Sequence, residues 1–160
     1  MEDYKKSDAP ILSLINFMLS SQSSKILYDY LRYENPLCYV CNSTAYMNYG
    51  VLIINAQIYR EKKDLALEQI KNVMEKLKNE EFVDKYLENV KDRKRINLIR
   101  RQDSIHCILD DFMDNYLDNR MPLDEEYEII KDLTSKDIVN LVNRLQLDTI
   151  YYLEGTRDAK

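Results

Sequence analysis

Few side chains in this 160-residue chain have the types and spacing for metal or nucleophilic chemistry. Cys38 and Cys41 have the spacing of half a zinc site, and His106 stands next to Cys107. In a regular strand, an offset of three residues places two side chains on opposite faces. Adjacent side chains on a helix diverge by about 100°. Because tetrahedral zinc needs ligands that converge, the pattern predicts reduced, mostly buried thiols and no zinc site.

His106 could instead serve as a general base for a nucleophile. Ser104 and Cys107 lie two positions and one position away from it. Side chains at those offsets do not face each other on a helix. A Cys/His-dependent enzyme therefore requires a fold that brings His106 and Cys107 into one cleft, and this alternative stays open.

Charged residues form two runs in the second half of the chain. The basic run consists of Lys91, Arg93, Lys94, Arg95, Arg100 and Arg101. The acidic run consists of Asp103, Asp110, Asp111, Asp114 and Asp118. The basic charges are distributed around a helix, which is typical of a solvated surface. The acidic run lacks the glycine and the terminal glutamate of a calcium-binding EF-hand loop.

The composition excludes several functional classes. The two glycines, Gly50 and Gly155, are too far apart for a phosphate-binding glycine loop. A net charge of −5 disfavours nucleic acid as the main partner. Three cysteines, an odd number, are typical of a reducing cytoplasm. The apolar stretch 11–19 is too short to cross a membrane and predicts a core helix. We therefore expect a cytoplasmic globular domain without a membrane partner.

The elements that must position these residues are mainly helices. Apolar spacing predicts helices over 11–19, 26–31, 61–78, 82–118 (divided near Arg100), 124–131 and 135–145. Strands are predicted over 37–46, 51–58 and 149–153, the first two as an antiparallel hairpin. The predicted fold is α+β, with helices packed on one face of a small antiparallel sheet. Residues 1–160 form one predicted domain, in which 1–9 and 155–160 are polar tails.

One segment carries a more specific pattern. Residues 23–39 read SSKILYDYLRYENPLCY. This stretch resembles the signature of the C-terminal domain in the insulinase-like zinc metallopeptidases, which include pitrilysin and mitochondrial processing peptidase. Their pattern is S-S-x-L followed by L-R-E-x-x-x-L-x-Y at the entry to a strand. The next strand and helix of that domain are similar to residues 51–58 and 61–77. The ending at 148–155 resembles the inactive bacterial subgroup.

The resemblance implies a non-catalytic domain. In this family the zinc ligands lie in another domain, on an HxxEH motif, and this chain contains neither that motif nor a second histidine. We expect no cofactor in this chain and zinc only in a partner domain or subunit. The chain would line a peptide chamber and pair with an HxxEH-bearing homologue in a homodimer or heterodimer. It would be the C-terminal fragment of a longer chain, without the first strand of the domain.

The resemblance also implies two substrate-binding residues. The family's arginine and tyrosine, seven positions apart, reach toward the peptide, and Arg32 and Tyr39 match that spacing. A guanidinium binds a peptide carbonyl, and a phenol donates to a developing oxyanion. Two departures affect this role. Residues 19–22, Leu-Ser-Ser-Gln, replace a glycine-rich turn, and Tyr33 replaces the family's glutamate.

The alternative is an unrelated α+β adaptor. Its helix over 91–101 would bind RNA or an acidic protein through the basic run. Such binding would weaken as salt increases.

Overall fold

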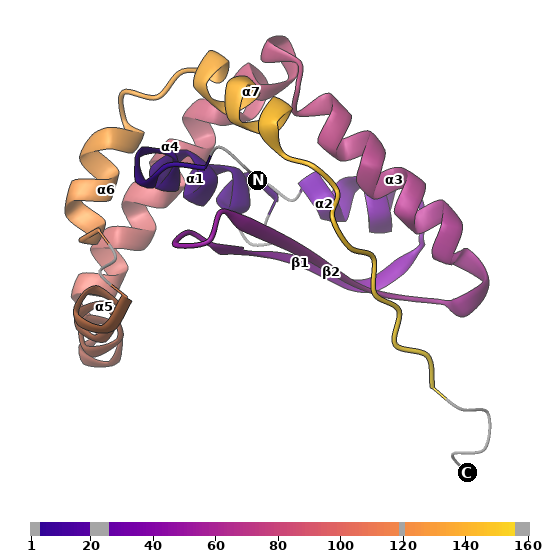
Figure 1. Cartoon of the computed structure of the whole chain (residues 1–160), viewed down its shortest axis with the longest axis horizontal. Helices are drawn as coiled ribbons and strands as arrows, with labels where there is room; N and C mark the ends of the chain where they lie inside the picture. Colours follow the sequence, from indigo (N-terminus) through magenta and orange to yellow (C-terminus); the bar gives the residue numbers. More distant parts are fainter. Residues whose placement is uncertain (1–3, 20–25, 119–120, 156–160) are drawn as a thin grey trace.

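The computed structural model describes residues 4–19, 26–118 and 121–155. In chain order its elements are η1 (Lys6–Asp8), α1 (Ala9–Leu19), α2 (Ile26–Tyr28), η2 (Asp29–Tyr33), β1 (Cys38–Tyr46), β2 (Val51–Ile58), η3 (Arg60–Lys62), α3 (Lys63–Lys76), α4 (Glu80–Gln102), α5 (Ile105–Asp118), α6 (Leu123–Ile130) and α7 (Ser135–Arg144). The helices gather over one face of the β1–β2 hairpin, and the other face is bare (Figure 1). This arrangement confirms the predicted α+β fold.

The predicted helix boundaries agree closely with the structure. The long stretch 82–118 is two helices, α4 and α5, separated at Asp103 and Ser104. Thr134 begins α7 with a capping box, in which the Asp137 carboxylate accepts from the Thr134 backbone N–H at 2.8 Å. Helices with strong local signals thus follow from the sequence alone.

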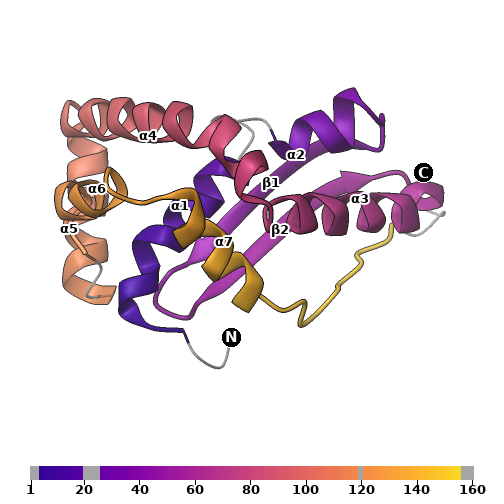
Figure 2. The same cartoon turned by 90° about the horizontal axis from the view of Figure 1, so that it is seen from above.

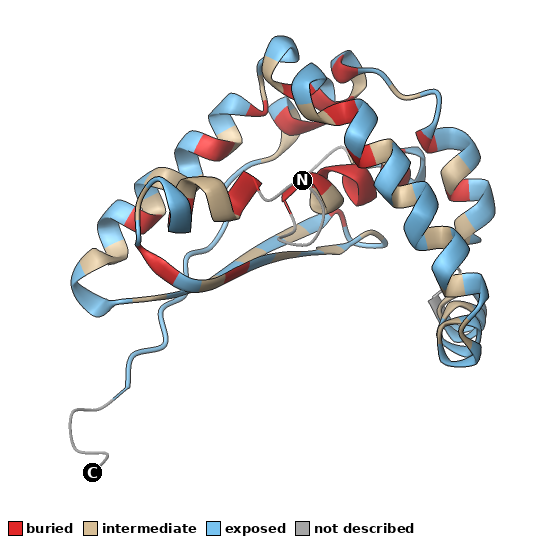
Figure 3. Ribbon diagram, turned by 180° about the vertical axis from the view of Figure 1, so that it is seen from behind, coloured by how far each residue is buried: buried red, intermediate tan, exposed pale blue. Residues whose placement is uncertain are grey.

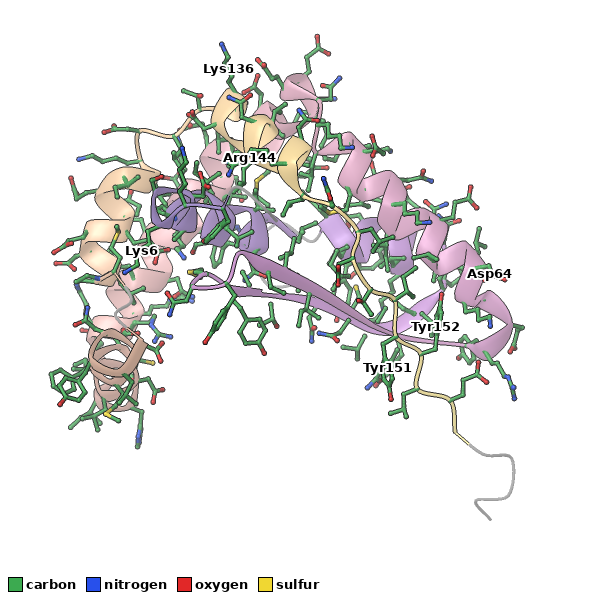
Figure 4. All side chains as sticks on the ribbon, in the orientation of Figure 1. Lys6, Asp64, Lys136, Arg144, Tyr151 and Tyr152 are labelled. Carbon is green, nitrogen blue, oxygen red and sulfur yellow. The ribbon has the colours of Figure 1, made fainter. Side chains whose placement is uncertain are left out.

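The third predicted strand is wrong. Within the described residues the sheet has two strands, and 149–153 is extended without pairing to either of them. Side chains hold this segment beside the start of α3 (Figure 4). Glu154 forms an ion pair with Arg60 at 2.9 Å, and the Lys63 ammonium lies 5.3 Å from the Tyr152 ring centre. The sequence pattern correctly indicates an extended segment, but it does not show whether another strand is available to pair with it.

The turn between β1 and β2 requires a glycine at position 50. Gly50 has a φ of 63°, in the left-handed region that favours glycine. A Cβ atom placed there would lie 2.5 Å from Cγ of Tyr4. The aromatic ring of Tyr4 therefore packs directly on the turn, and this part of the segment predicted as a polar tail belongs to the folded body.

The core lies between the hairpin and the helices, with α1 at its centre. Buried positions concentrate on the inner surfaces of the helix layer (Figure 3, seen from behind), and Figure 2 shows α1 passing beneath α7. The largest fully buried side chains are Leu12, Leu14, Ile15, Met18, Leu19, Ile26, Leu27, Leu31, Leu77, Ile130, Ile138 and Leu141. The prediction that 11–19 is a core helix is confirmed.

A buried polar network joins three helices around this core. Ser13 of α1 donates to the Glu126 carboxylate of α6 at 2.5 Å. Lys94 of α4 donates to the Ser13 hydroxyl at 2.7 Å and lies 3.0 Å from the same carboxylate. The Glu126 side chain is 3% exposed and that of Lys94 17%. Each charge is thus desolvated and depends on its partner.

Replacing Glu126 by alanine should destabilise the fold by about 3 kcal/mol, because it leaves the Lys94 ammonium buried without its counter-charge. The free energy of unfolding from urea titrations would measure this loss. Glu128→Ala is the matched control on the same helix, since Glu128 pairs with Lys131 on the surface, and it should leave stability unchanged. Equal stability of the two variants would contradict a structural role for the network.

A second ion pair joins η1, near the start of the described chain, to the end of α7. The Arg144 guanidinium donates to both carboxylate oxygens of Asp8, at 3.2 and 2.9 Å. Burial raises the pKa of the Asp8 carboxyl, but hydrogen bonds from Arg144 and from the Lys5 backbone N–H outweigh burial and lower it below its ordinary value. Asp8 therefore stabilises the fold fully above its unfolded pKa, and this contribution is lost as pH falls through the folded pKa.

The substitution Asp8→Asn should lower stability by about 1 kcal/mol at pH 7, because Arg144 is partly exposed and solvent screens the pair. The difference from the wild type should shrink as pH falls below about 4, the ordinary pKa of Asp8 in the unfolded chain, toward its lower pKa in the fold. Urea unfolding at pH 7, 5, 4 and 3 would measure it. Asp92→Asn, on the exposed side of α4, serves as control. A difference that stays constant with pH would refute the assignment.

Candidate functional site

The predicted site residue Arg32 lies in an irregular helical turn. Residues 29–33 form the π-helical turn η2, in which the Glu34 backbone N–H donates to the Asp29 carbonyl at 2.8 Å. A π turn contains one residue more than an α-helical turn, and such turns are frequent at functional sites. The Leu37 N–H then closes the segment onto the Leu31 carbonyl at 2.9 Å. Leu31 is buried in this turn and Arg32 is exposed.

A bulge at the start of β1 determines where Tyr39 points. Cys38 pairs with Ile58, but Val40 pairs with Gln57, so β1 has an extra residue relative to β2. Such a bulge changes the alternation of side chains. Cys38 and Cys41 are therefore both buried, and Tyr39 is 73% exposed. The expectation that the two cysteines lie on opposite faces is wrong, because it assumed a regular strand.

The structure brings the two predicted site residues together. The Arg32 guanidinium carbon lies 5.5 Å from the centre of the Tyr28 ring and 5.9 Å from that of Tyr39. We call Tyr28, Arg32 and Tyr39 the Arg32 cluster. Among the residues that the structure describes, no hydrogen bond or ion pair occupies the Arg32 guanidinium. Its N–H donors and the Tyr39 hydroxyl are thus available to a carbonyl or carboxylate from outside.

The two thiols beneath the cluster are unsuited to reaction. Burial raises the pKa of the Cys38 thiol, and it raises that of Cys41 to about 12. The nearby positive charge of Arg32 lowers both pKa values, but less than burial raises them. Within the described ranges, no group of three or more His, Cys, Asp or Glu side chains is arranged to hold a metal. These thiols therefore act as packing residues under Arg32.

A second cation lies at the same end of the hairpin. Lys62 donates to the Pro36 carbonyl at 3.0 Å, and its ammonium lies 5.7 Å from the centre of the Tyr59 ring. Sequence reasoning missed Tyr28, Tyr59 and Lys62 as neighbours of the site. The dense tyrosines between 28 and 59 were the available signal, but their spacing does not show which of them meet a cation.

The other sequence candidates do not form sites. His106 is exposed on α5, and the described chain gives it no hydrogen-bonded nucleophile, so the Cys/His-enzyme alternative lacks its required cleft. Part of the basic run is used internally. Lys91 bonds the Lys131 carbonyl, Lys94 lies in the buried network, and Arg101 pairs with Asp111. This use of cations does not favour the nucleic-acid adaptor.

Parts of the predicted signature lie outside the described residues, namely Ser20 to Gln22 of the replaced glycine-rich turn and the Ser23-Ser24 pair. Among the helices that the structure describes, none has the length and apolar character to cross a membrane.

Comparisons with known proteins agree with the family resemblance of this chain. Residues 1–94 match the family model described as the peptidase M16 inactive domain. A probable inactive metalloprotease of Bacillus subtilis is 23% identical over 157 residues, which cover 98% of this chain and 37% of that protein. A solved protease from Helicobacter pylori is 21% identical and has the same fold, with a TM-score of 0.76 over 88% of this chain and 35% of that one.

The chain thus spans little more than a third of these relatives. The matched region includes α1, both strands, α3, the Arg32 cluster and most of α4. The predicted resemblance is confirmed, and with it a non-catalytic, peptidase-like character: the chain belongs to the peptidase M16 inactive-domain family.

Proposed function

We propose that this chain binds an extended peptide through Arg32 and Tyr39, as one wall of the chamber of an M16-type peptidase. The observation that carries the proposal is the Arg32 cluster. A guanidinium is held over two rings, and no internal acceptor in the described chain occupies it. Arg32 is exposed, so its hydrogen-bond donors face solvent and can exchange water for an acceptor on a ligand.

The chemistry of the cluster fits a peptide main chain. The planar guanidinium presents several donors in one plane, and stacking on Tyr28 and Tyr39 limits its motion. Tyr39 adds one hydroxyl and a large exposed ring, which suits contact with side chains of varied type. Both groups mainly donate hydrogen bonds, so carbonyl oxygens and C-terminal carboxylates are the complementary ligands.

Replacing Arg32 by alanine should weaken binding of a fluorescein-labelled unstructured peptide by roughly 10- to 100-fold, the loss expected for a charged hydrogen bond. Tyr39→Phe should weaken it only a few fold. Fluorescence anisotropy would measure both, and melting temperatures should change little, because Arg32 is exposed and contacts the described fold only through weak cation–π contacts with Tyr28 and Tyr39. Arg93→Ala, an exposed arginine on α4, is the matched control. Equal binding by Arg32→Ala and the wild type would refute the site.

The proposal also includes a catalytic partner. This chain has a single histidine and no HxxEH motif, so its residues do not fit the zinc site of the family. Zinc and the activated water would belong to a homologous domain or subunit across the chamber, and Arg32 and Tyr39 would hold the peptide against it. We place this assembly in the cytoplasm, where the three free cysteines stay reduced.

Affinity purification of the tagged chain from its native lysate should recover an HxxEH-bearing homologue, identified by mass spectrometry. Zinc measured by atomic emission should follow that homologue and be missing from the purified chain alone. Recovery of RNA in its place, released by salt, would overturn the proposed pairing and favour the adaptor.

A further inference from the structure

The helix α5 packs on the rest of the protein through a mostly polar face, whereas a surface helix ordinarily packs through its apolar face. Its partly buried side chains are Cys107, Asp111 and Asp114, which lie on one side of the helix. Asp111 pairs there with Arg101 of α4. No described residue of α5 is buried, and Figure 3 shows the helix without a buried position at one end of the molecule.

The opposite face of α5 is apolar and points to solvent. Its residues recur at helical spacing, and their exposed fractions range from 47% to 75%. We call them the α5 stripe: Ile105, Ile108, Leu109, Phe112, Met113 and Tyr116. The sequence predicts this periodicity, which normally indicates a face turned to the core. In the structure the core lies on the other side.

The size of the stripe corresponds to a protein interface. Six large side chains, at on the order of 100 Å² of exposed area each, present roughly 600 Å². A stable interface buries roughly 800 Å² on each partner, and the largest apolar patch of a typical monomer is about 300–600 Å². Leu117, which is 66% exposed beside the stripe, extends the area further. The face is therefore large enough for most of a dimer interface.

The order of residues favours a second copy of this chain as the occupant. The spacing of the stripe reads the same in both directions, as a twofold contact between antiparallel helices requires. Such a contact places Ile105 opposite Tyr116 of the other copy, and Leu109 opposite Phe112. The branched aliphatic residues occupy the first half of the stripe, and the aromatic residues and Met113 the second. Each aromatic side chain therefore meets a smaller aliphatic one.

Charge is compatible with the same pairing. Asp110, Asp111 and Asp114 lie outside the stripe by helical spacing, and Asp111 pairs with Arg101. At this register Asp110 lies level with Asp111 of the other copy, outside the stripe, and the Arg101 charge offsets that of Asp111. The antiparallel arrangement also sets the two helix dipoles in opposite directions. We propose that two copies of this chain associate through antiparallel α5 helices.

Sedimentation velocity of the purified chain between about 1 and 100 µM should show a monomer–dimer equilibrium. Leu109→Asp and Phe112→Asp should each weaken dimerisation roughly 30-fold or more, because each buries a carboxylate at the centre of the contact. Both side chains are exposed in the monomer, so circular dichroism should stay unchanged. Leu153→Asp, at a residue that is 87% exposed outside α5, is the matched control. A monomer at every concentration, or a dimer that both substitutions leave intact, would overturn the proposal.

A cysteine pair tests the antiparallel orientation. In the variant Ile105→Cys/Tyr116→Cys the two thiols are about 16 Å apart along one helix, too far for a disulfide within one chain. Mild oxidation with diamide should give a covalent dimer on a non-reducing gel. The wild type, which keeps Cys107 on the other side of α5, is the control and should stay uncrosslinked. Crosslinking of Ile105→Cys alone as efficiently as the pair would indicate parallel helices and overturn the arrangement.

Discussion

The buried contact among Ser13, Lys94 and Glu126 determines how the helix layer is arranged. Hydrophobic burial brings α1, α4 and α6 together, but it is non-directional and does not fix which helix faces meet. One carboxylate that must face both an ammonium and a hydroxyl permits few arrangements. The three residues are far apart in sequence and lie at 2.5–3.0 Å from one another. The same contact removes Lys94 from the basic surface. It also fixes the position of α4, the helix that α5 directly follows.

The helix layer in turn supports the hairpin that carries the candidate site. Only one face of the two-stranded sheet is covered, so the exposed alternation along β2 follows from a single packed layer (Figure 1). Arg32 and Tyr39 lie where the helical segment passes into β1. The cluster is therefore built on the junction between the layers. Each of its residues follows a buried neighbour that anchors it: Leu27, Leu31 or Cys38.

The limits of sequence reasoning are visible in particular residues. Helices such as α3 and α7 follow from apolar spacing and the Thr134 cap, because those signals are local. Arg32 and Tyr39 could be named from a family pattern, but their stacking could not. It depends on a π turn and a β-bulge, which are irregularities that no periodic pattern encodes. The segment 149–153 and the α5 stripe show a second limit. Periodicity predicts that a segment is extended or that a helix is amphipathic, but it does not determine which other element packs against it.

Because of the β-bulge, the number of residues between Arg32 and Tyr39 determines which side chains face the core and which face solvent. Side chains of a strand alternate with a period of two, so inserting or deleting one residue before Val40 would exchange the inner and outer positions. The aromatic ring would enter the core and a thiol would face solvent. Substitutions between the two residues keep the spacing, whereas a change of length does not. Over evolution, this stretch should therefore tolerate variation in amino-acid type far better than any change in the number of residues.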